Sequence, residues 1–295
     1  MNIPYVKLND GNKMPQIGLG VWKAKDGQEV QKAVKVALND GYGLIDTAAA
    51  YGNEAGVGAG IRLSDVERDD IFVTTKLWNG DQGYDSTMKA FDASLQRLGL
   101  DYIDLYLIHW PVAKMGKYID TWKAFIEIQK SGRAKSIGVC NFSIENLDTL
   151  IDETGVVPAI NQIELHPRLQ QEPLRNYCMS KGIHVESWSP IGGSGSELLS
   201  DPVIEKIAKK HDKSSAQVII RWHIQSGLIV IPKSIHDERI KENIDVFDFE
   251  LDERDMEEIE FMNTNTRQGP DPSTFGMHTN TAVIQFAHRM GFAGR

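Results

Sequence analysis

A chain of 295 residues fits one large α/β domain or two small ones. Hydrophobic residues make up 41% and charged residues 25% of the chain, which is an ordinary globular composition. The formal net charge of -9 argues against nucleic acid as a partner, so a polyanionic ligand would need a local basic pocket.

Membrane and secretory signals are missing from the sequence pattern. No run approaches about 18 apolar residues, the length of a membrane-spanning helix, and the N-terminus has no apolar signal core. The two cysteines, Cys140 and Cys178, suggest neither a disulfide framework nor a metal site. We therefore expect a cytoplasmic protein with no membrane partner.

Short apolar runs alternate with helix-periodic stretches from one end of the chain to the other. The runs are rich in Val, Ile and Leu without strict alternation, as in strands buried on both faces. They predict strands over 17–22, 42–48, 70–77, 103–110, 135–142, 159–165, 184–190 and 228–234. The stretches between them predict helices over 28–39, 53–63, 85–99, 118–131, 144–153, 170–181, 202–225 (two helices split near Asp212) and 237–243.

Local signals refine these boundaries. Asp10-Gly11 predicts a hairpin within residues 3–16 that closes the floor of the fold. Ser143 and Asp85-Ser86 are candidate N-caps, and residues 252–262 predict an additional helix. Glycines expected at or just past helix ends are Gly41, Gly99, Gly132 and Gly182.

Eight strand–helix repeats in one series predict a (β/α)8 TIM barrel in the α/β class. A doubly wound open sheet is the alternative, but Gly18-Leu19-Gly20 is followed by Val21-Trp22-Lys23, so the G-x-G-x-x-G fingerprint fails. We expect one domain over 1–295, with a hairpin (1–16), a barrel with its extra helix (17–262) and a tail near the substrate site (263–295).

Four titratable side chains follow the ends of early strands. Asp46, Lys76 and His109 each end an apolar run, and Tyr51 follows the first run by a short turn. The C-terminal ends of parallel barrel strands are where such folds hold their catalytic residues. The four side chains therefore predict a proton-transfer site.

The chemistry of such a site follows from the residue types. A free tyrosine has a pKa of about 10, and an adjacent ammonium from Lys76 should lower the pKa of Tyr51. Asp46 would keep Lys76 protonated and oriented, and His109 would donate a hydrogen bond to a carbonyl oxygen. The group suits proton donation to an oxyanion formed when hydride reaches a carbonyl carbon.

Specific motifs occur along nearly the whole chain. They are Asp46-Thr47-Ala48 with Tyr51-Gly52-Asn53-Glu54, Thr75-Lys76-Leu77-Trp78, Asp104-Leu105-Tyr106-Leu107-Ile108-His109-Trp110-Pro111, Ile137-Gly138-Val139-Cys140-Asn141-Phe142, Asn161-Gln162-Ile163-Glu164-Leu165-His166-Pro167 and Ile231-Pro232-Lys233-Ser234. With these motifs the sequence resembles the aldo-keto reductases, and among them it is most similar to the bacterial 2,5-diketo-D-gluconate reductases.

The resemblance implies a monomeric barrel and NADPH-dependent reduction of aldehydes or ketones, with diketogluconate and other small dicarbonyls as candidate substrates. It implies that Tyr51 is the general acid, that Lys76 and Asp46 tune it, and that His109 orients the carbonyl. It also implies cofactor contacts from Asn141, Gln162, Trp188, Ser189, Ile191, Gly192, Lys233, Ser234, Arg239, Glu242 and Asn243. Trp22, Trp78, Trp110 and His109 are expected to form the substrate pocket.

The position of two cations agrees with this assignment. Barrel phosphate sites gather at the loops after the seventh and eighth strands, where Lys233 and Arg239 lie. They are the local basic pocket that an acidic chain requires, and they favour NADPH over NADH. Cys140 stands where the family usually has serine, and His236 stands where a small polar residue is common.

Two other functions remain as alternatives. A regulatory subunit that senses the cofactor would look the same in sequence if it turned over slowly. A metal-dependent hydrolase would use Glu164 with His166 and His184 with Glu186, because residues two apart on a strand share a face. We expect no metal, since no His-x-His motif ends the first strand.

Overall fold

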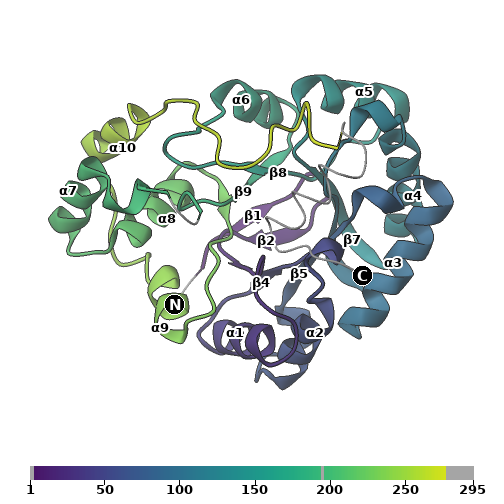
Figure 1. The fold of residues 1–295 in the computed structure, drawn as a ribbon, viewed down its shortest axis with the longest axis horizontal. Helices are drawn as coiled ribbons and strands as arrows, with labels where there is room; N and C mark the ends of the chain where they lie inside the picture. Colours follow the sequence, from purple (N-terminus) through teal and green to yellow (C-terminus); the bar gives the residue numbers. More distant parts are fainter. Residues whose placement is uncertain (1–2, 194–195, 277–295) are drawn as a thin grey trace.

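Parallel strands form the centre of the structure, and helices surround them (Figure 1). The computed structural model describes residues 3–193 and 196–276. In this part of the chain, eight strands lie in the order β10-β9-β8-β7-β6-β5-β4-β3. Bridges from Ile17 to Val230 and from Gly20 to Lys233 join the first strand to the last. The predicted (β/α)8 barrel is confirmed, and the doubly wound alternative was wrong.

The barrel strands occur where the apolar runs predicted them, although the first and last are short. They are β3 (Leu19–Gly20), β4 (Leu44–Asp46), β5 (Phe72–Leu77), β6 (Ile103–Ile108), β7 (Ala134–Cys140), β8 (Ile160–Glu164), β9 (His184–Trp188) and β10 (Ile229–Val230). Gly20 is required where the ring closes, because a Cβ there would lie 2.9 Å from the carbonyl oxygen of Ile231.

The predicted helices are present as well, with small shifts of their ends. They are α1 (Gln28–Asn39), α2 (Glu54–Leu63), α3 (Tyr84–Leu98), α4 (Tyr118–Lys130), α5 (Ile144–Thr154), α6 (Glu172–Ser180), α7 (Pro202–His211), α8 (Ser215–Gln225), α9 (Asp237–Ile244) and α10 (Glu253–Glu260). Asp212 divides α7 from α8 in a left-handed conformation with φ of 54°. No helix of the described residues is long and apolar enough to span a membrane.

The two predicted N-caps had different outcomes. Ser143 caps α5, since its hydroxyl accepts from the backbone N–H of Asn146 in a reciprocal capping box. The Asp85-Ser86 cap was wrong, because α3 begins at Tyr84 after Gly83. Gly83 has a φ of 117°, and the Ser86 hydroxyl donates instead to the carbonyl of Gln82 at 3.0 Å.

An N-terminal hairpin closes the floor of the barrel. β1 (Tyr5–Lys7) pairs antiparallel with β2 (Lys13–Pro15). Leu8 and Met14 are buried in one cluster with inward-facing strand residues such as Leu44 and Leu105. Burying these side chains stabilises the floor by removing apolar surface from water, and it leaves the opposite end of the barrel open.

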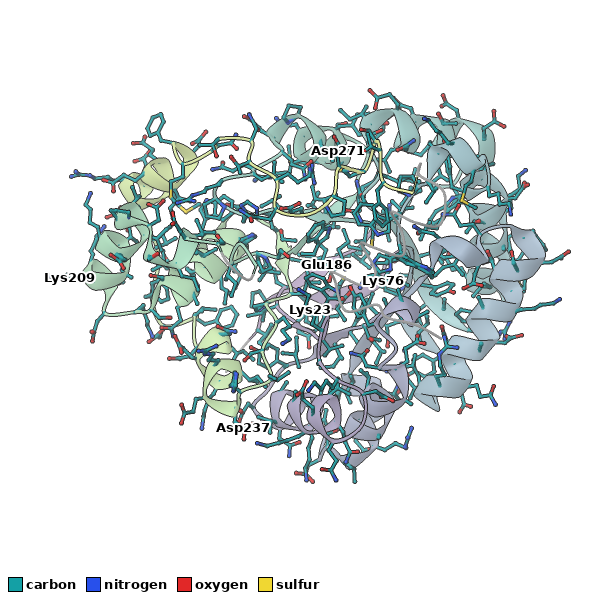
Figure 2. The ribbon with its side chains drawn as sticks, viewed as in Figure 1. Lys23, Lys76, Glu186, Lys209, Asp237 and Asp271 are labelled. Carbon is teal, nitrogen blue, oxygen red and sulfur yellow. The ribbon has the colours of Figure 1, made fainter. Side chains whose placement is uncertain are left out.

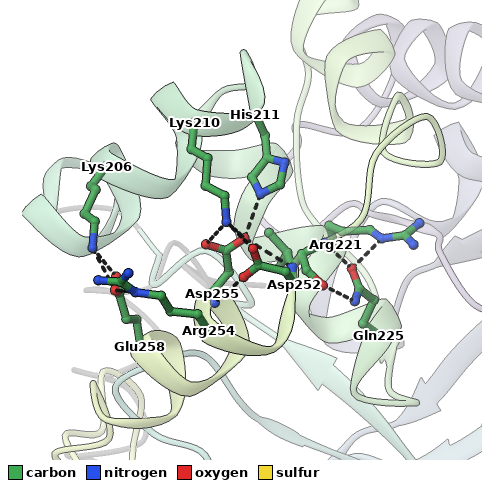
Figure 3. Close-up of polar contacts among 10 residues, drawn as sticks. Lys206, Lys210, His211, Arg221, Gln225, Asp252, Arg254, Asp255 and Glu258 are labelled. Carbon is green, nitrogen blue, oxygen red and sulfur yellow. Dashed lines mark hydrogen bonds and ion pairs between the residues drawn. The ribbon is translucent and has the colours of Figure 1, made fainter.

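Helix α10 is held against α7 by a network of charges, which Figure 3 shows in close-up. Lys210 donates to both Asp252 and Asp255, and His211 contacts Asp255 at 2.7 Å. Asp252 also caps α10 by accepting from the backbone N–H of Asp255. The network fixes where the chain leaves α10 for the open end of the barrel.

Residues 263–276, which we call the strap, cross this open end. Figure 1 shows the strap as a yellow segment that runs from α10 past α6. Phe275 lies against Trp110 with ring centroids 4.2 Å apart, and against Trp78 at 6.4 Å. The predicted tail can be followed to Gly276, and its remainder, residues 277–295, lies outside the described residues.

Candidate active site

A cavity of about 370 Å³ opens at the C-terminal ends of the barrel strands. Among its walls are Asp46, Tyr51 and His109, and Lys76 lies buried behind Tyr51. Figure 2 places Lys76 near the centre of the view, within the ring of helices. The four predicted catalytic side chains, which come from three strands and one turn, are therefore brought together.

Contacts among three of these residues form a chain of hydrogen bonds. Lys76 Nζ donates to Asp46 Oδ1 at 2.6 Å and to the carbonyl oxygen of Thr47 at 2.8 Å. The same nitrogen lies 3.3 Å from the hydroxyl of Tyr51. Lys76 is 0% exposed and Asp46 is 1% exposed, so the pair interacts in a medium that screens charge weakly.

Burial and charge act in opposite directions on these groups. Burial alone would lower the pKa of Lys76, but the Asp46 carboxylate outweighs it and raises that pKa above its usual value. Burial raises the pKa of Tyr51 above its usual range, and Lys76 opposes the rise without cancelling it. The expected net lowering of the Tyr51 pKa was therefore wrong, because desolvation is the larger effect. Tyr51 is fully protonated at neutral pH, as a proton donor must be.

His109 stands beside the phenol at the cavity wall. Its ring is edge-on to Tyr51 with centroids 5.7 Å apart, and edge-on to Trp78 at 5.3 Å. Burial, followed by the charge of Lys76, lowers the pKa of His109 well below its usual value. The imidazole is therefore neutral near pH 7 and carries one N–H with which to orient a carbonyl oxygen.

Two of the predicted cofactor residues, Asn141 and Gln162, contribute side-chain amides to the cavity wall, and Asn141 holds a third, Trp188. Asn141 has a φ of 63°, donates from Nδ2 to the carbonyl of His109 at 3.0 Å, and accepts from the indole N–H of Trp188. Gln162 donates from Nε2 to Asp46 Oδ2 at 2.8 Å. Asn141, Gln162 and Trp188 all line the cavity, so the two amides orient an aromatic ring and a carboxylate there.

Cations gather at another part of the cavity wall. Lys233 and Arg239 both line it, together with Ser189 and Ile191. Burial lowers the pKa of Lys233 below its usual value. Sequence reasoning missed Lys23, which also lines the wall and lies 4.4 Å from the ring of Trp22. The only sequence feature that could have indicated Lys23 was the neighbouring Trp22.

Some predicted cofactor residues are not brought to the wall of the cavity. They are Gly192, Ser234, Glu242 and Asn243, of which Asn243 is 4% exposed. Ser234 accepts the backbone N–H of His236 at 3.2 Å just before α9. Its hydroxyl therefore shapes the turn that carries Arg239 toward the cavity.

Glu164 and His166 do not form an open metal site. Glu164 is 0% exposed and accepts from His166 Nε2 at 3.2 Å, Gln268 N at 2.6 Å and Gly269 N at 3.0 Å. Arg267 lies 3.3 Å from the same carboxylate. Within residues 3–193 and 196–276, no three His, Cys, Asp or Glu side chains gather as a metal site would require. Glu164 instead anchors the strap.

Comparison with known proteins identifies the relatives of this chain. A family model described as the aldo/keto reductase family matches residues 16–263. An aldo-keto reductase of Mycolicibacterium smegmatis is 58% identical over 272 residues, covering 92% of this chain and 98% of that protein.

This chain belongs to the aldo/keto reductase family.

Two further relatives connect the family to a substrate and a cofactor. Methylglyoxal reductase DkgA of Escherichia coli is 52% identical over 275 residues, covering 93% of this chain and 99% of that protein. The structure of a variant of Gox0644 in complex with NADPH has a TM-score of 0.88 at 50% identity, covering 93% of this chain and 99% of that one. Because its relatives are reductases, this aldo/keto reductase is an enzyme that reduces carbonyl groups, and the regulatory alternative has no support.

Proposed function

We propose that this enzyme uses NADPH to reduce small dicarbonyl compounds, converting one carbonyl group to an alcohol. The observation that carries the chemistry is the contact between Lys76 Nζ and the Tyr51 hydroxyl at 3.3 Å, beside His109 at the cavity wall. NADPH, when bound, supplies the hydride. The residues of the chain bind and orient the reactants and deliver the proton.

The cavity suits a phosphorylated nucleotide because three cations gather along its wall. Lys23, Lys233 and Arg239 line the wall, and none of them makes an ion pair within the described residues. These exposed cations lie on one wall of a single cavity, and like charges gathered in this way favour an anion. We assign Lys233 and Arg239 to the 2'-phosphate, which NADH lacks, and Trp188, Asn141 and Gln162 to the nicotinamide.

Tyr51 is the proton donor in this proposal. Its hydroxyl gives a proton to the substrate oxygen as negative charge develops there, and the Lys76 ammonium stabilises the phenolate left behind. Asp46 keeps Lys76 charged through the bond of 2.6 Å. His109 donates its N–H to the same oxygen and so fixes the carbonyl carbon in place.

Support for a dicarbonyl substrate comes from the pocket and from a relative. Trp22, Trp78 and Trp110 line the cavity around His109 with uncharged surface. Pro270 of the strap lines the same cavity, so the room for a substrate is limited. A relative that is 52% identical is named a methylglyoxal reductase. Small, uncharged aldehydes with a second carbonyl group fit these features.

The enzyme is further proposed to work as a monomer in the cytoplasm. All the side chains invoked above come from one chain, and Cys140 and Cys178 are free and buried. Light scattering after gel filtration tests the first point, since a dimer in the presence of NADPH would contradict it.

The experiment for the substrate compares methylglyoxal with propanal, which matches it in carbon number and lacks the ketone. NADPH consumption is followed at equal enzyme concentration, with diketogluconate as a third carbonyl compound. We expect kcat/KM to be at least about tenfold higher for methylglyoxal, because an adjacent carbonyl makes the aldehyde more electrophilic. Equal values for methylglyoxal and propanal would contradict the dicarbonyl assignment.

The cofactor assignment is tested by binding alone. NADPH should quench tryptophan fluorescence more tightly than NADH, and the double change Lys233→Gly with Arg239→Ala should remove that difference. Lys130→Gly with Arg133→Ala is a matched control, because both residues lie outside the cavity. A preference for NADPH that survives the first pair would contradict the 2'-phosphate assignment.

A further inference from the structure

A second carboxyl group lies buried below the catalytic cavity. Glu186 on β9 is 0% exposed, and the register of β8 and β9 pairs it with Gln162. Its Oε2 accepts from Gln162 Nε2 at 2.7 Å, and its Oε1 has no hydrogen-bond partner within the described residues. Figure 2 labels Glu186 beside Lys76 near the centre of the view. Burying a carboxyl group is costly, so its position calls for an explanation.

The amide of Gln162 lies between two carboxyl groups. Its Nε2 donates to Asp46 Oδ2 at 2.8 Å and to Glu186 Oε2 at 2.7 Å. An amide oxygen turned toward the ionised Asp46 carboxylate would meet a second acceptor, so the orientation with Nε2 toward the carboxyl groups is the one that satisfies Asp46. Asp46 alone would hold one N–H, whereas Glu186 fixes the other. The Oε1 atom of Gln162 is then left to face the cavity that this residue lines.

The charges around Glu186 show which carboxyl holds a proton. The titratable groups that act on it from other strands of the barrel are Asp46 on β4, Lys76 on β5 and Cys140 on β7. On its other side β10 contributes the apolar Ile229. One ammonium thus serves two carboxyl groups, and Asp46 contacts it directly. Burial, with the charge of Asp46 added, raises the pKa of Glu186 to about 8.

We propose that Glu186 is a positioning residue that holds the Gln162 amide with Oε1 toward the carboxamide of the nicotinamide, and that ionisation of Glu186 favours the oxidised, positively charged cofactor. This inference rests on the proposed role of Gln162. When Glu186 is neutral, it adds no charge near the uncharged nicotinamide ring of NADPH. When Glu186 is ionised, its negative charge lies on the other side of the Gln162 amide from the ring and favours the positively charged ring of NADP+. Affinity for NADP+ relative to NADPH therefore rises with pH, and by linkage NADP+ binding releases a proton.

The test measures affinity by calorimetry for NADPH and NADP+ between about pH 6.5 and about pH 9, on either side of the ionisation. The ratio of the two dissociation constants cancels the 2'-phosphate, which both forms carry. For the unchanged enzyme we expect the dissociation constant for NADP+, divided by that for NADPH, to fall roughly tenfold across this pH range, as one added charge in a weakly screened interior predicts. Glu186→Gln keeps an acceptor for Gln162 but cannot ionise, so its ratio should stay constant.

A cofactor-free measurement checks the same group. Infrared titration should show a protonated carboxyl band that disappears as pH rises through about 8, and Glu186→Gln should lack it. Glu186→Met removes the acceptor as well and should weaken NADPH binding at every pH, whereas Glu186→Gln should restore it. Because Glu186→Gln preserves shape, the ratio experiment decides even if the Met variant does not fold.

The outcomes separate this inference from the proposed function. Identical pH dependence of the ratio in the unchanged enzyme and in Glu186→Gln would overturn the role of Glu186, with NADPH binding intact. Weak binding of NADPH by the unchanged enzyme would instead overturn the cofactor assignment. A Met variant that folds and binds NADPH as tightly as the unchanged enzyme would show that Glu186 does not hold the Gln162 amide.

Discussion

The indole N–H of Trp188 donates a hydrogen bond of 2.9 Å to Oδ1 of Asn141. Asn141 in turn donates to the backbone carbonyl of His109 at 3.0 Å. The ring proposed to stack on the nicotinamide is thus tied to the end of the strand that carries His109. A tyrosine at position 188 would have no N–H at this point of the ring, so the tryptophan supplies a bond as well as a surface.

Removing this bond should weaken cofactor binding. Trp188→Phe keeps an aromatic face but leaves Asn141 Oδ1 without its donor, which costs about 1 kcal/mol. We expect the dissociation constant for NADPH, measured by calorimetry, to rise about fivefold. Trp122→Phe is the matched control, because its indole N–H bonds to the carbonyl of Val156 away from the cavity. An equal rise in both variants would contradict a local role.

Loss of the Tyr51 hydroxyl should stop turnover and spare binding. Tyr51→Phe removes the proposed proton donor, and general acid catalysis is worth about 10²–10⁴-fold in rate. We expect kcat to fall by that factor and the NADPH dissociation constant to stay within about twofold. Tyr42→Phe, which loses a buried bond to the carbonyl of Ile240, should lower the unfolding midpoint and leave kcat unchanged. Comparable losses of kcat in the two variants would argue against Tyr51 as the acid.

The strap should detach when Gly269 gains a side chain. A Cβ at Gly269 would lie 2.4 Å from Cη2 of Trp188, whereas one at Gly80 would meet nothing within 4 Å. Overpacking of this kind costs about 1–3 kcal/mol. In Gly269→Ala we expect faster hydrogen exchange at the amides of Gln268 and Gly269, both of which donate to Glu164. Gly80→Ala should leave that exchange unchanged, and unaltered exchange in both variants would show that the strap is held elsewhere.

Stability should fall in mild acid because of buried histidine. His223 is 0% exposed and contacts the carbonyls of Ile219 at 2.8 Å and Leu165 at 3.1 Å. Burial lowers its pKa to about 4, outweighing the two carbonyls, which favour the protonated ring; this is below the value of about 6.5 for an unfolded histidine. Between these two pKa values the unfolded chain binds more protons than the folded chain does. The free energy of unfolding therefore increases with pH and decreases as the pH falls.

The size of this effect can be measured by urea unfolding at about pH 7 and about pH 4.5. A pKa difference of this size corresponds to roughly 3 kcal/mol when the titration is complete. His223→Gln should unfold with a shallower pH dependence, although His109 contributes in the same direction. His184→Gln changes a less buried histidine and serves as the control. A steep dependence that persists in His223→Gln would assign the loss to other groups.

Local patterns were sufficient for the fold and for selecting four candidate catalytic residues that the structure brings together at one cavity. Periodicity predicted the strands and helices, and Ser143 marked the start of α5 because capping depends on residues within one turn. Asp46, Lys76 and His109 were identifiable because strand ends in a barrel face one opening. Such features depend on neighbours in sequence, which is why the sequence alone carried them.

Contacts across the interior could not be predicted in the same way. Gln162 and Asp46 are 116 positions apart, and Glu164 reaches Gln268 across 104 positions. Alternation along a strand shows that Glu186 and Glu164 face one side or the other, but not which side chain each one meets. Glu186 therefore entered only as a possible metal ligand, and the anchoring of the strap by Glu164 had no sequence signal.

Closure of the ring between Gly20 and Lys233 has a consequence for synthesis on the ribosome. A nascent chain that has just passed His109 already contains all four side chains proposed to be catalytic. It lacks β8, β9 and β10, so Gln162 is missing and the Asp46–Lys76 pair has no walls to exclude water. Pairings so distant in sequence form late. The enzyme should therefore acquire its activity in a single late step, after β10 has left the exit tunnel.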